Sequence, residues 1–165
     1  MPLVDAVARE LDQEAPVTRR VLARVPLDRR DWKPHPKSMT LGQLAAWMAN
    51  APGWTAGVVG KDGFEIGDFA PFPAPAAAEE LVSTFDAGCE AARAALARVG
   101  DAAALGEWSF RMQGKPIRTL PRIAVLRLFL LSDAIHHRGQ MSVYLRLLDV
   151  PVPSIYGPSA DEGPA

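Results

Sequence analysis

Cysteine is nearly absent from this sequence, since Cys89 is the one thiol among 165 residues. A single cysteine excludes an intrachain disulfide framework and a zinc or iron–sulfur site built from several thiolates. Cys89 falls in an apolar helical stripe, where we expect an inert core thiol. Excess charge is also absent, because 18 basic residues are balanced by 19 acidic ones and the net charge is −1. Direct binding to nucleic acid, which depends on many Lys and Arg contacts with phosphates, is therefore not expected.

Long apolar runs are missing as well. The longest strongly apolar stretch, residues 123–131, is interrupted by Arg127 and is too short to span a bilayer. The first residues carry neither the basic region nor the apolar region of a secretory signal. The sequence has no Gly-rich phosphate loop, nucleophile elbow or internal repeat. These absences predict a cytoplasmic protein with no membrane partner.

Alanine is the residue that the chain has in quantity. Its 27 alanines, against 7% aromatic residues, favour close-packed helices over sheets. Apolar spacing of three and four residues predicts helices over 3–24, 40–58, 76–99 and 121–149. We therefore expect a single domain, residues 1–165, of the all-α class: a four-helix bundle with a long crossover between the second and third helices.

Local patterns refine this prediction. Pro16 lies inside the first helix and is expected to kink or restart it. Thr40 and Gln43 match a capping box at the start of the second helix. Between the helices, residues 59–75 are expected to form a long ordered loop. Residues 106–118 indicate either a small hairpin or an irregular crossover.

The last predicted helix carries the residues best suited to chemistry. Asp133 and His137 are four residues apart and therefore share one face. Gln140 and Tyr144 continue the same stripe, which is otherwise leucine. Three interpretations of the Asp133–His137 pair stay open. The pair can ligate a divalent metal, it can act as an acid–base pair in which Asp133 orients His137, or it can close a small buried polar network.

Three other side chains are weaker candidates. His136 points about 100° away from His137 around the helix, so we interpret it as a surface or packing residue. His35 lies in a Pro-rich connection, from which it can reach a site near the second helix or hydrogen-bond to backbone. Trp47, one position before Met48, is expected to pack at the edge of the core.

Four segments resemble the DinB (damage-inducible) family, which includes YfiT-like metalloenzymes. They are residues 37–45, 136–140, 143–146 and 153–162, which read KSMTLGQLA, HHRGQ, VYLR and PSIYGPSADE. The resemblance extends in order over nearly the whole chain. It implies a bundle of four long helices, a homodimer, and a divalent metal held by three histidines, one on the second helix and two spaced H-x-x-x-H on the last.

Carried onto this chain, the resemblance keeps one of the three histidines. His137 matches the last one, Asp133 stands where its partner four residues earlier falls, and Trp47 stands at or next to the histidine of the second helix. Indole cannot ligate a metal, whereas a carboxylate can. Asp133 and His137 are thus the expected metal ligands, completed by His35 or water, and they hold Zn, Ni, Mn or Fe weakly or not at all.

The resemblance and the substitutions together lead to two functional hypotheses. The first is a DinB-like bundle protein of unknown activity with a degenerate metal site, in which Trp47 and Asp133 replace histidines. The alternative is a divalent-metal-dependent transferase or hydrolase that acts on a small thiol or electrophile in a bacterial stress response. In that case Asp133, His137 and Tyr144 line the catalytic pocket, and the partner is a small-molecule thiol substrate.

Overall fold

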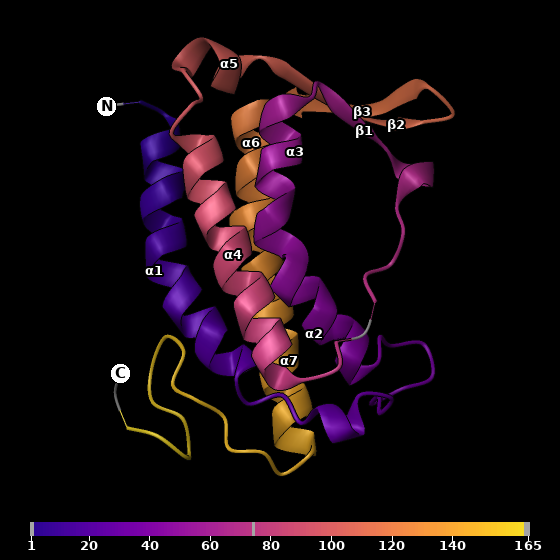
Figure 1. The fold of residues 1–165 in the computed structure, drawn as a ribbon, viewed down its shortest axis with the longest axis vertical. Helices are drawn as coiled ribbons and strands as arrows, with labels where there is room; N and C mark the ends of the chain where they lie inside the picture. Colours follow the sequence, from indigo (N-terminus) through magenta and orange to yellow (C-terminus); the bar gives the residue numbers. More distant parts are fainter. Residues whose placement is uncertain (1, 74, 164–165) are drawn as a thin grey trace.

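The computed structural model describes residues 2–73 and 75–163. Long helical stretches run side by side through the molecule (Figure 1). Their bounds are Val4–Leu22 for α1, Leu41–Asn50 for α2, Trp54–Gly60 for α3, Ala78–Leu96 for α4, Arg122–Arg127 for α6 and Asp133–Leu147 for α7. A 3₁₀ turn, Ala51–Gly53, joins α2 to α3, and a π-helical turn, Leu128–Ser132, joins α6 to α7.

The helices agree closely with the spacing of apolar residues in the sequence. The capping box is present, because Thr40 Oγ1 accepts a hydrogen bond from the Gln43 amide and Gln43 Oε1 accepts one from the Thr40 amide. Helix α1 continues through Pro16 rather than restarting there. Ala15 and Thr18 on either side of Pro16 are buried, and their packing against the core holds the helix together across the missing hydrogen bond.

A three-stranded mixed sheet overturns the prediction of an all-α four-helix bundle. Strands β1 (Gly63–Glu65), β2 (Glu107–Met112) and β3 (Lys115–Pro121) pair in the order β1-β2-β3. β1 is parallel to β2, and β2 is antiparallel to β3. Residues 106–118 thus belong to a hairpin, and residues 59–75 contain the end of α3 and a strand rather than loop throughout.

The hairpin forms because its turn suits the twist of paired strands. Gln113 and Gly114 both have positive φ angles, 52° and 75°, which is the conformation of a two-residue type I′ turn. The Glu65 carboxylate accepts hydrogen bonds from both of their amides, at 2.8 and 3.0 Å. A side chain of β1 therefore stabilises the turn between β2 and β3.

The sheet lies at one end of the helices, beside the end of α3 and the start of α6 (Figure 1). A short helix, α5 (Asp101–Leu105), precedes β2 at this end. After β1 the chain returns along the length of the helices toward the start of α4 (Figure 1). No helix among the described residues is both long and apolar enough to cross a membrane.

Candidate functional site

The candidate site lies where α2 packs against α7, and the start of α7 determines its geometry. The π-helical turn directly precedes Asp133, the first residue of α7. Such a turn contains one more residue than an α-helical turn, and it occurs often at functional sites. Leu130 and Leu131 within it are buried, so the turn is anchored in the core and holds Asp133 toward α2.

Four polar side chains form a hydrogen-bonded chain between the two helices, which we call the Trp47 network. Trp47 Nε1 donates to Asp133 Oδ2 at 2.7 Å. His137 Nε2 lies 3.3 Å from the other oxygen, Asp133 Oδ1. His137 Nδ1 in turn lies 2.7 Å from Gln140 Oε1. The structure therefore brings Asp133 and His137 together, as their spacing in the sequence predicts. Trp47, which was expected to pack at the edge of the core, also donates a hydrogen bond to Asp133.

The environment of His137 favours its protonated form. Burial of the ring lowers the pKa of His137, but the hydrogen bonds with Asp133 and Gln140 and the negative charge of Asp133 together outweigh it. The pKa of His137 is therefore raised above its ordinary value of 6.5. Because both ring nitrogens face oxygen acceptors, neither is left with a lone pair directed at a ligand.

This raised pKa predicts a pH-dependent contribution to stability. The folded protein binds the His137 proton more tightly than the unfolded chain does, so the contribution is fully present below about pH 6.5 and is lost as the pH rises through the folded-state pKa. Urea unfolding of the native protein and of His137→Gln should therefore differ more at about pH 5.5 than at about pH 8.5. His35→Gln, in the exposed connection, is the matched control, and an equal difference at both pH values would contradict the prediction.

A divalent metal ion, implied by the resemblance, does not fit the Trp47 network. The indole of Trp47 offers a donor where a ligand is needed, and it occupies Asp133 Oδ2. The space beside Asp133, bounded by Trp47 and Trp54 among others, measures about 10 Å³, which is about the least that admits one water and leaves no room for a full coordination shell. In the part of the chain that the structure describes, no three His, Cys, Asp or Glu side chains come together as a metal-binding group.

The remaining residues singled out from the sequence lie apart from this network. Tyr144 donates to the backbone oxygen of Met39 at 3.1 Å and packs edge-on against Trp32. His35 is exposed, and its Nδ1 accepts a hydrogen bond from the Lys37 amide within its own loop. His136 is exposed, although its ring is adjacent to that of His137. The hydrogen bonds of Tyr144 and His35 are therefore made with partners other than Asp133 and His137, and their part in a site with that pair stays a prediction.

Aromatic side chains from several segments surround the network. Trp47 packs against Phe69 and Phe72 of the returning segment, with ring centroids 5.4 and 6.0 Å apart. Trp54 of α3 packs against the same two rings and against Phe129 of the π-helical turn. The sequence reasoning missed this cluster. Its one available signal is the alternation of phenylalanine and proline at residues 69–73, which does not reveal the tryptophans that it meets.

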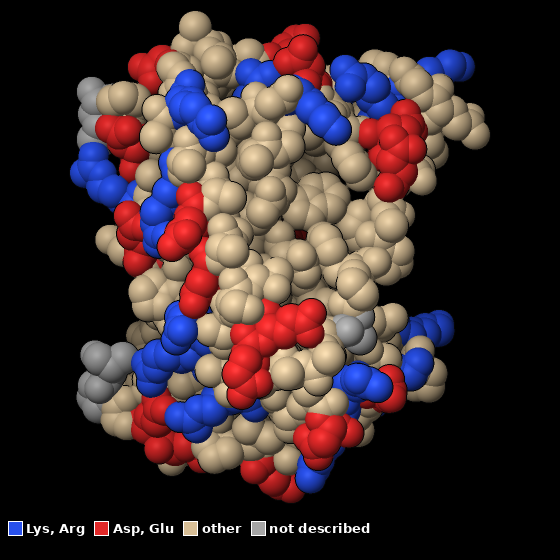
Figure 2. All heavy atoms as spheres, in the orientation of Figure 1, with Lys and Arg blue, Asp and Glu red and all other residues tan. Residues whose placement is uncertain are grey.

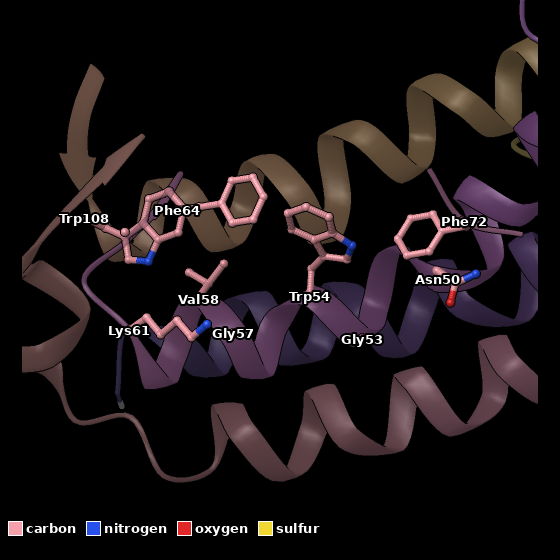
Figure 3. A pocket seen from close by; sticks show the side chains of 10 residues that line it. Asn50, Gly53, Trp54, Gly57, Val58, Lys61, Phe64, Phe72 and Trp108 are labelled. Atoms are coloured by element: carbon pink, nitrogen blue, oxygen red, sulfur yellow. The ribbon is translucent and has the colours of Figure 1, made fainter. Parts of the chain in front are cut away.

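Beyond Trp54 the cluster opens into a cavity of about 380 Å³, which we call the aromatic cavity. Its aromatic walls are Trp54, Phe64, Phe72 and Trp108, from α3, β1, the returning segment and β2 (Figure 3). Figure 2 shows this face of the molecule hollowed beside α3, with mostly uncharged side chains around the hollow. The volume falls within the roughly 300–1,000 Å³ that is usual for small-molecule pockets.

Comparisons with known proteins agree with the resemblance seen in the sequence. The model of the DinB family matches residues 4–164. A DinB-like protein of known structure from Bacillus cereus is 22% identical, with a TM-score of 0.69 over 88% of this chain and 92% of that one. Another from Bacillus subtilis is 18% identical, with a TM-score of 0.69 over 91% and 96%.

These two likenesses show a shared fold, and no curated protein is detectably similar to this chain. The match to the family model covers nearly the whole length. The chain therefore belongs to the DinB family.

Proposed function

We propose that this protein binds a small molecule and works without a tightly held metal ion or metal catalysis. The observation that carries the proposal is the hydrogen bond from Trp47 Nε1 to Asp133 Oδ2, at 2.7 Å. It places a donor where the family resemblance implies a metal ligand. The position at which the resemblance implies a metal ligand thus contributes to a hydrogen-bonded network in this chain.

The Trp47 network needs no metal ion, because its polar atoms already have one another as partners. Both oxygens of Asp133 and both ring nitrogens of His137 have partners. An ion entering the site would have to break these contacts, and each buried polar group left unpaired costs about 1–3 kcal/mol. Two protein ligands on one helix supply fewer bonds than the three or more that zinc sites normally use.

The aromatic cavity supports the binding part of the proposal. It lies next to the network, since Trp54 and Phe72 line both the cavity and the small space beside Asp133. A mostly apolar cavity with a few polar groups is the usual form of a small-molecule site.

The second candidate function is the metal-dependent transferase or hydrolase acting on a small thiol. The observation that favours it is the proximity of two ligand types, because Asp133 Oδ1 and His137 Nε2 are 3.3 Å apart on a half-buried surface. This candidate requires Trp47 to release Asp133 and a third ligand to come from solvent. It predicts that a divalent ion stabilises the folded protein.

Unfolding in the presence of zinc distinguishes the two candidates. A site with a Kd of about 1 µM would stabilise the folded protein by about 2.7 kcal/mol at about 100 µM zinc. We expect the urea midpoint of the native protein to be the same in zinc as in EDTA, because the Trp47 network leaves no ligand set. A zinc-dependent increase that is lost in His137→Gln, but kept in the control His35→Gln, would favour the metal-dependent enzyme.

The homodimer implied by the family resemblance is also proposed here. Light scattering tests it directly, since a dimer has twice the 17.8 kDa mass of the chain.

A further inference from the structure

We propose that the aromatic cavity binds a small aromatic carboxylate, with the ring between the aromatic walls and the carboxylate between Trp108 Nε1 and the Lys61 ammonium. This inference rests on the proposed binding function and names its ligand class. It depends on the cavity alone and not on the Trp47 network.

The main observation behind this inference is a buried hydrogen-bond donor, the indole nitrogen of Trp108, at one end of the cavity. Trp108 is 2% exposed, and its Nε1 has no hydrogen-bond partner among the described residues. Buried polar groups in proteins are nearly always paired, so an orphaned donor on a residue that lines a cavity favours an acceptor supplied by a ligand. In Figure 3 the indole nitrogen lies on the side of the ring toward Val58 and Lys61.

The charge at the cavity selects the kind of acceptor. Among the described residues that line the cavity, Lys61 is the one that is charged, and its side chain extends along the cavity from the Trp108 end toward Gly57 (Figure 3). No ion pair between its ammonium and a carboxylate is present among the described residues, and the carboxylate of the neighbouring Asp62 pairs with Arg122 at 2.6 Å. A donor on Trp108 and a cation on Lys61, with no acidic residue among the described residues of the lining, favour an anionic acceptor that lies between them.

The aromatic side chains that line the rest of the cavity favour a ligand with a flat, apolar ring. Trp54 and Phe64 have ring centroids 5.1 Å apart, and Trp54 and Phe72 have centroids 6.4 Å apart, so aromatic faces and edges border the cavity. A ligand ring can pack against them in the offset or edge-to-face arrangements that aromatic pairs prefer. An aliphatic acid would fill the same volume with fewer of these contacts.

Two glycines keep the cavity open on the α3 side. Gly53 and Gly57 are one helical turn apart, and a Cβ atom added at either would meet no atom within 4 Å. Glycine inside a helix is less stable than alanine, so Gly57 in the middle of α3 lowers the stability of the helix. No close contact requires a glycine at this position. The space that its missing side chain leaves is part of the cavity.

Calorimetric titration of the full-length protein with 2-naphthoate, and with the neutral 2-naphthylmethanol, tests the inference. We expect one 2-naphthoate per chain, bound about tenfold more tightly than the alcohol, because the alcohol lacks the charge that Lys61 pairs with. Lys61→Gln should remove this preference while leaving the alcohol unaffected. Trp108→Phe should weaken 2-naphthoate by about tenfold, since it keeps the ring and removes the donor.

Gly57→Leu tests the location of binding, because its side chain fills the cavity without a clash at Cβ. It should abolish binding of both compounds while circular dichroism shows a native fold. Gly139→Leu, at an exposed helical glycine of α7, and Lys115→Gln, at an exposed lysine of β3, are the matched controls and should bind like the native protein.

Three results would overturn the inference: no binding of 2-naphthoate at millimolar concentration, equal affinity for acid and alcohol, or unchanged binding by folded Gly57→Leu. These results are distinct from failure of the proposed function. Stabilisation by zinc would contradict the proposal that the protein works without a metal, and it would leave the 2-naphthoate titration unchanged. A protein that is free of metal but does not bind 2-naphthoate would instead contradict the proposed ligand class.

Discussion

Replacing Arg138 with methionine is expected to lower the free energy of unfolding by about 3 kcal/mol. Arg138 is 1% exposed, and its guanidinium donates to the Glu14 carboxylate at 2.5 Å and to Thr18 Oγ1 at 3.1 Å. It also donates to the Tyr156 hydroxyl at 2.5 Å. One side chain of α7 thereby joins α1 and the C-terminal segment. Methionine keeps the bulk of the stem but leaves the half-buried Glu14 carboxylate without its counter-ion.

Thermal unfolding measures this loss, which corresponds to about 6–12 °C in Tm for a domain of this size. Arg146→Met is the matched control on the same helix. Arg146 pairs with Asp161, but its side chain is 49% exposed, so solvent screens the pair and its loss should lower Tm far less than the loss of Arg138. The double variant Glu14→Met with Arg138→Met should be more stable than Arg138→Met alone, because it leaves no unpaired charge. Equal Tm values for Arg138→Met and Arg146→Met would contradict this account of the buried pair.

Replacing Trp47 and Asp133 together with histidine is expected to create a tight zinc site. Trp47 Nε1 and Asp133 Oδ2 are 2.7 Å apart, and the rings of Trp47 and His137 have centroids 5.7 Å apart, so the three positions meet at one point. Three imidazoles and a water form a common zinc coordination shell. The gain in zinc affinity should be at least about 100-fold, which corresponds to about 2.7 kcal/mol.

Calorimetric titration with zinc, after treatment with EDTA, measures this gain. The matched control replaces Trp32, which packs on Tyr144 and not on Asp133, together with Asp133. Trp32→His with Asp133→His has the same composition as the test variant and should gain little affinity. If the test variant keeps its helical circular dichroism and still binds zinc no better than the control, these three positions do not correspond to the metal site of the family.

The helices could be predicted because their apolar spacing is local. Val4, Val7 and Leu11 repeat at helical intervals, and all three are buried in α1. The capping box at Thr40 and Gln43 is equally local, since both hydrogen bonds span three residues. Each of these features depends on residues within a few turns of one another.

The sheet could not be predicted in the same way. β1 has three residues, too few to show a period, and it pairs with β2 more than 40 residues later in the chain. In β2 the alternation of Trp108 and Phe110 with polar residues does indicate a strand, but the turn is Gln113-Gly114 rather than the more usual Asn-Gly. A hairpin was one of the two predictions for residues 106–118, but the Ala-rich composition favoured an all-helical fold and nothing local indicated that β1 joins the hairpin in a sheet.

The site was predictable only in its helical part. Asp133 and His137 share a face because of their spacing, and the structure pairs them. The bond from Trp47 links residues 86 positions apart, and no local pattern specifies it. The same holds for the aromatic cavity, where Trp108 of β2 meets Phe64 of β1 and Trp54 of α3 only after the chain has folded. Arg138 belongs to the recognised HHRGQ segment, but its role in joining α1 and the C-terminal segment depends on Glu14 and Tyr156.

In the proposed function, the hydrogen-bonded Trp47 network stands where the family resemblance implies a metal site. Elemental analysis of the native protein, expressed without a histidine tag and purified without chelator, tests it most directly. With Trp47 Nε1 donating to Asp133 Oδ2, we expect far less than one Zn, Ni, Mn or Fe per chain. One equivalent of any of these metals per chain, lost in the variant His137→Gln, would contradict the account.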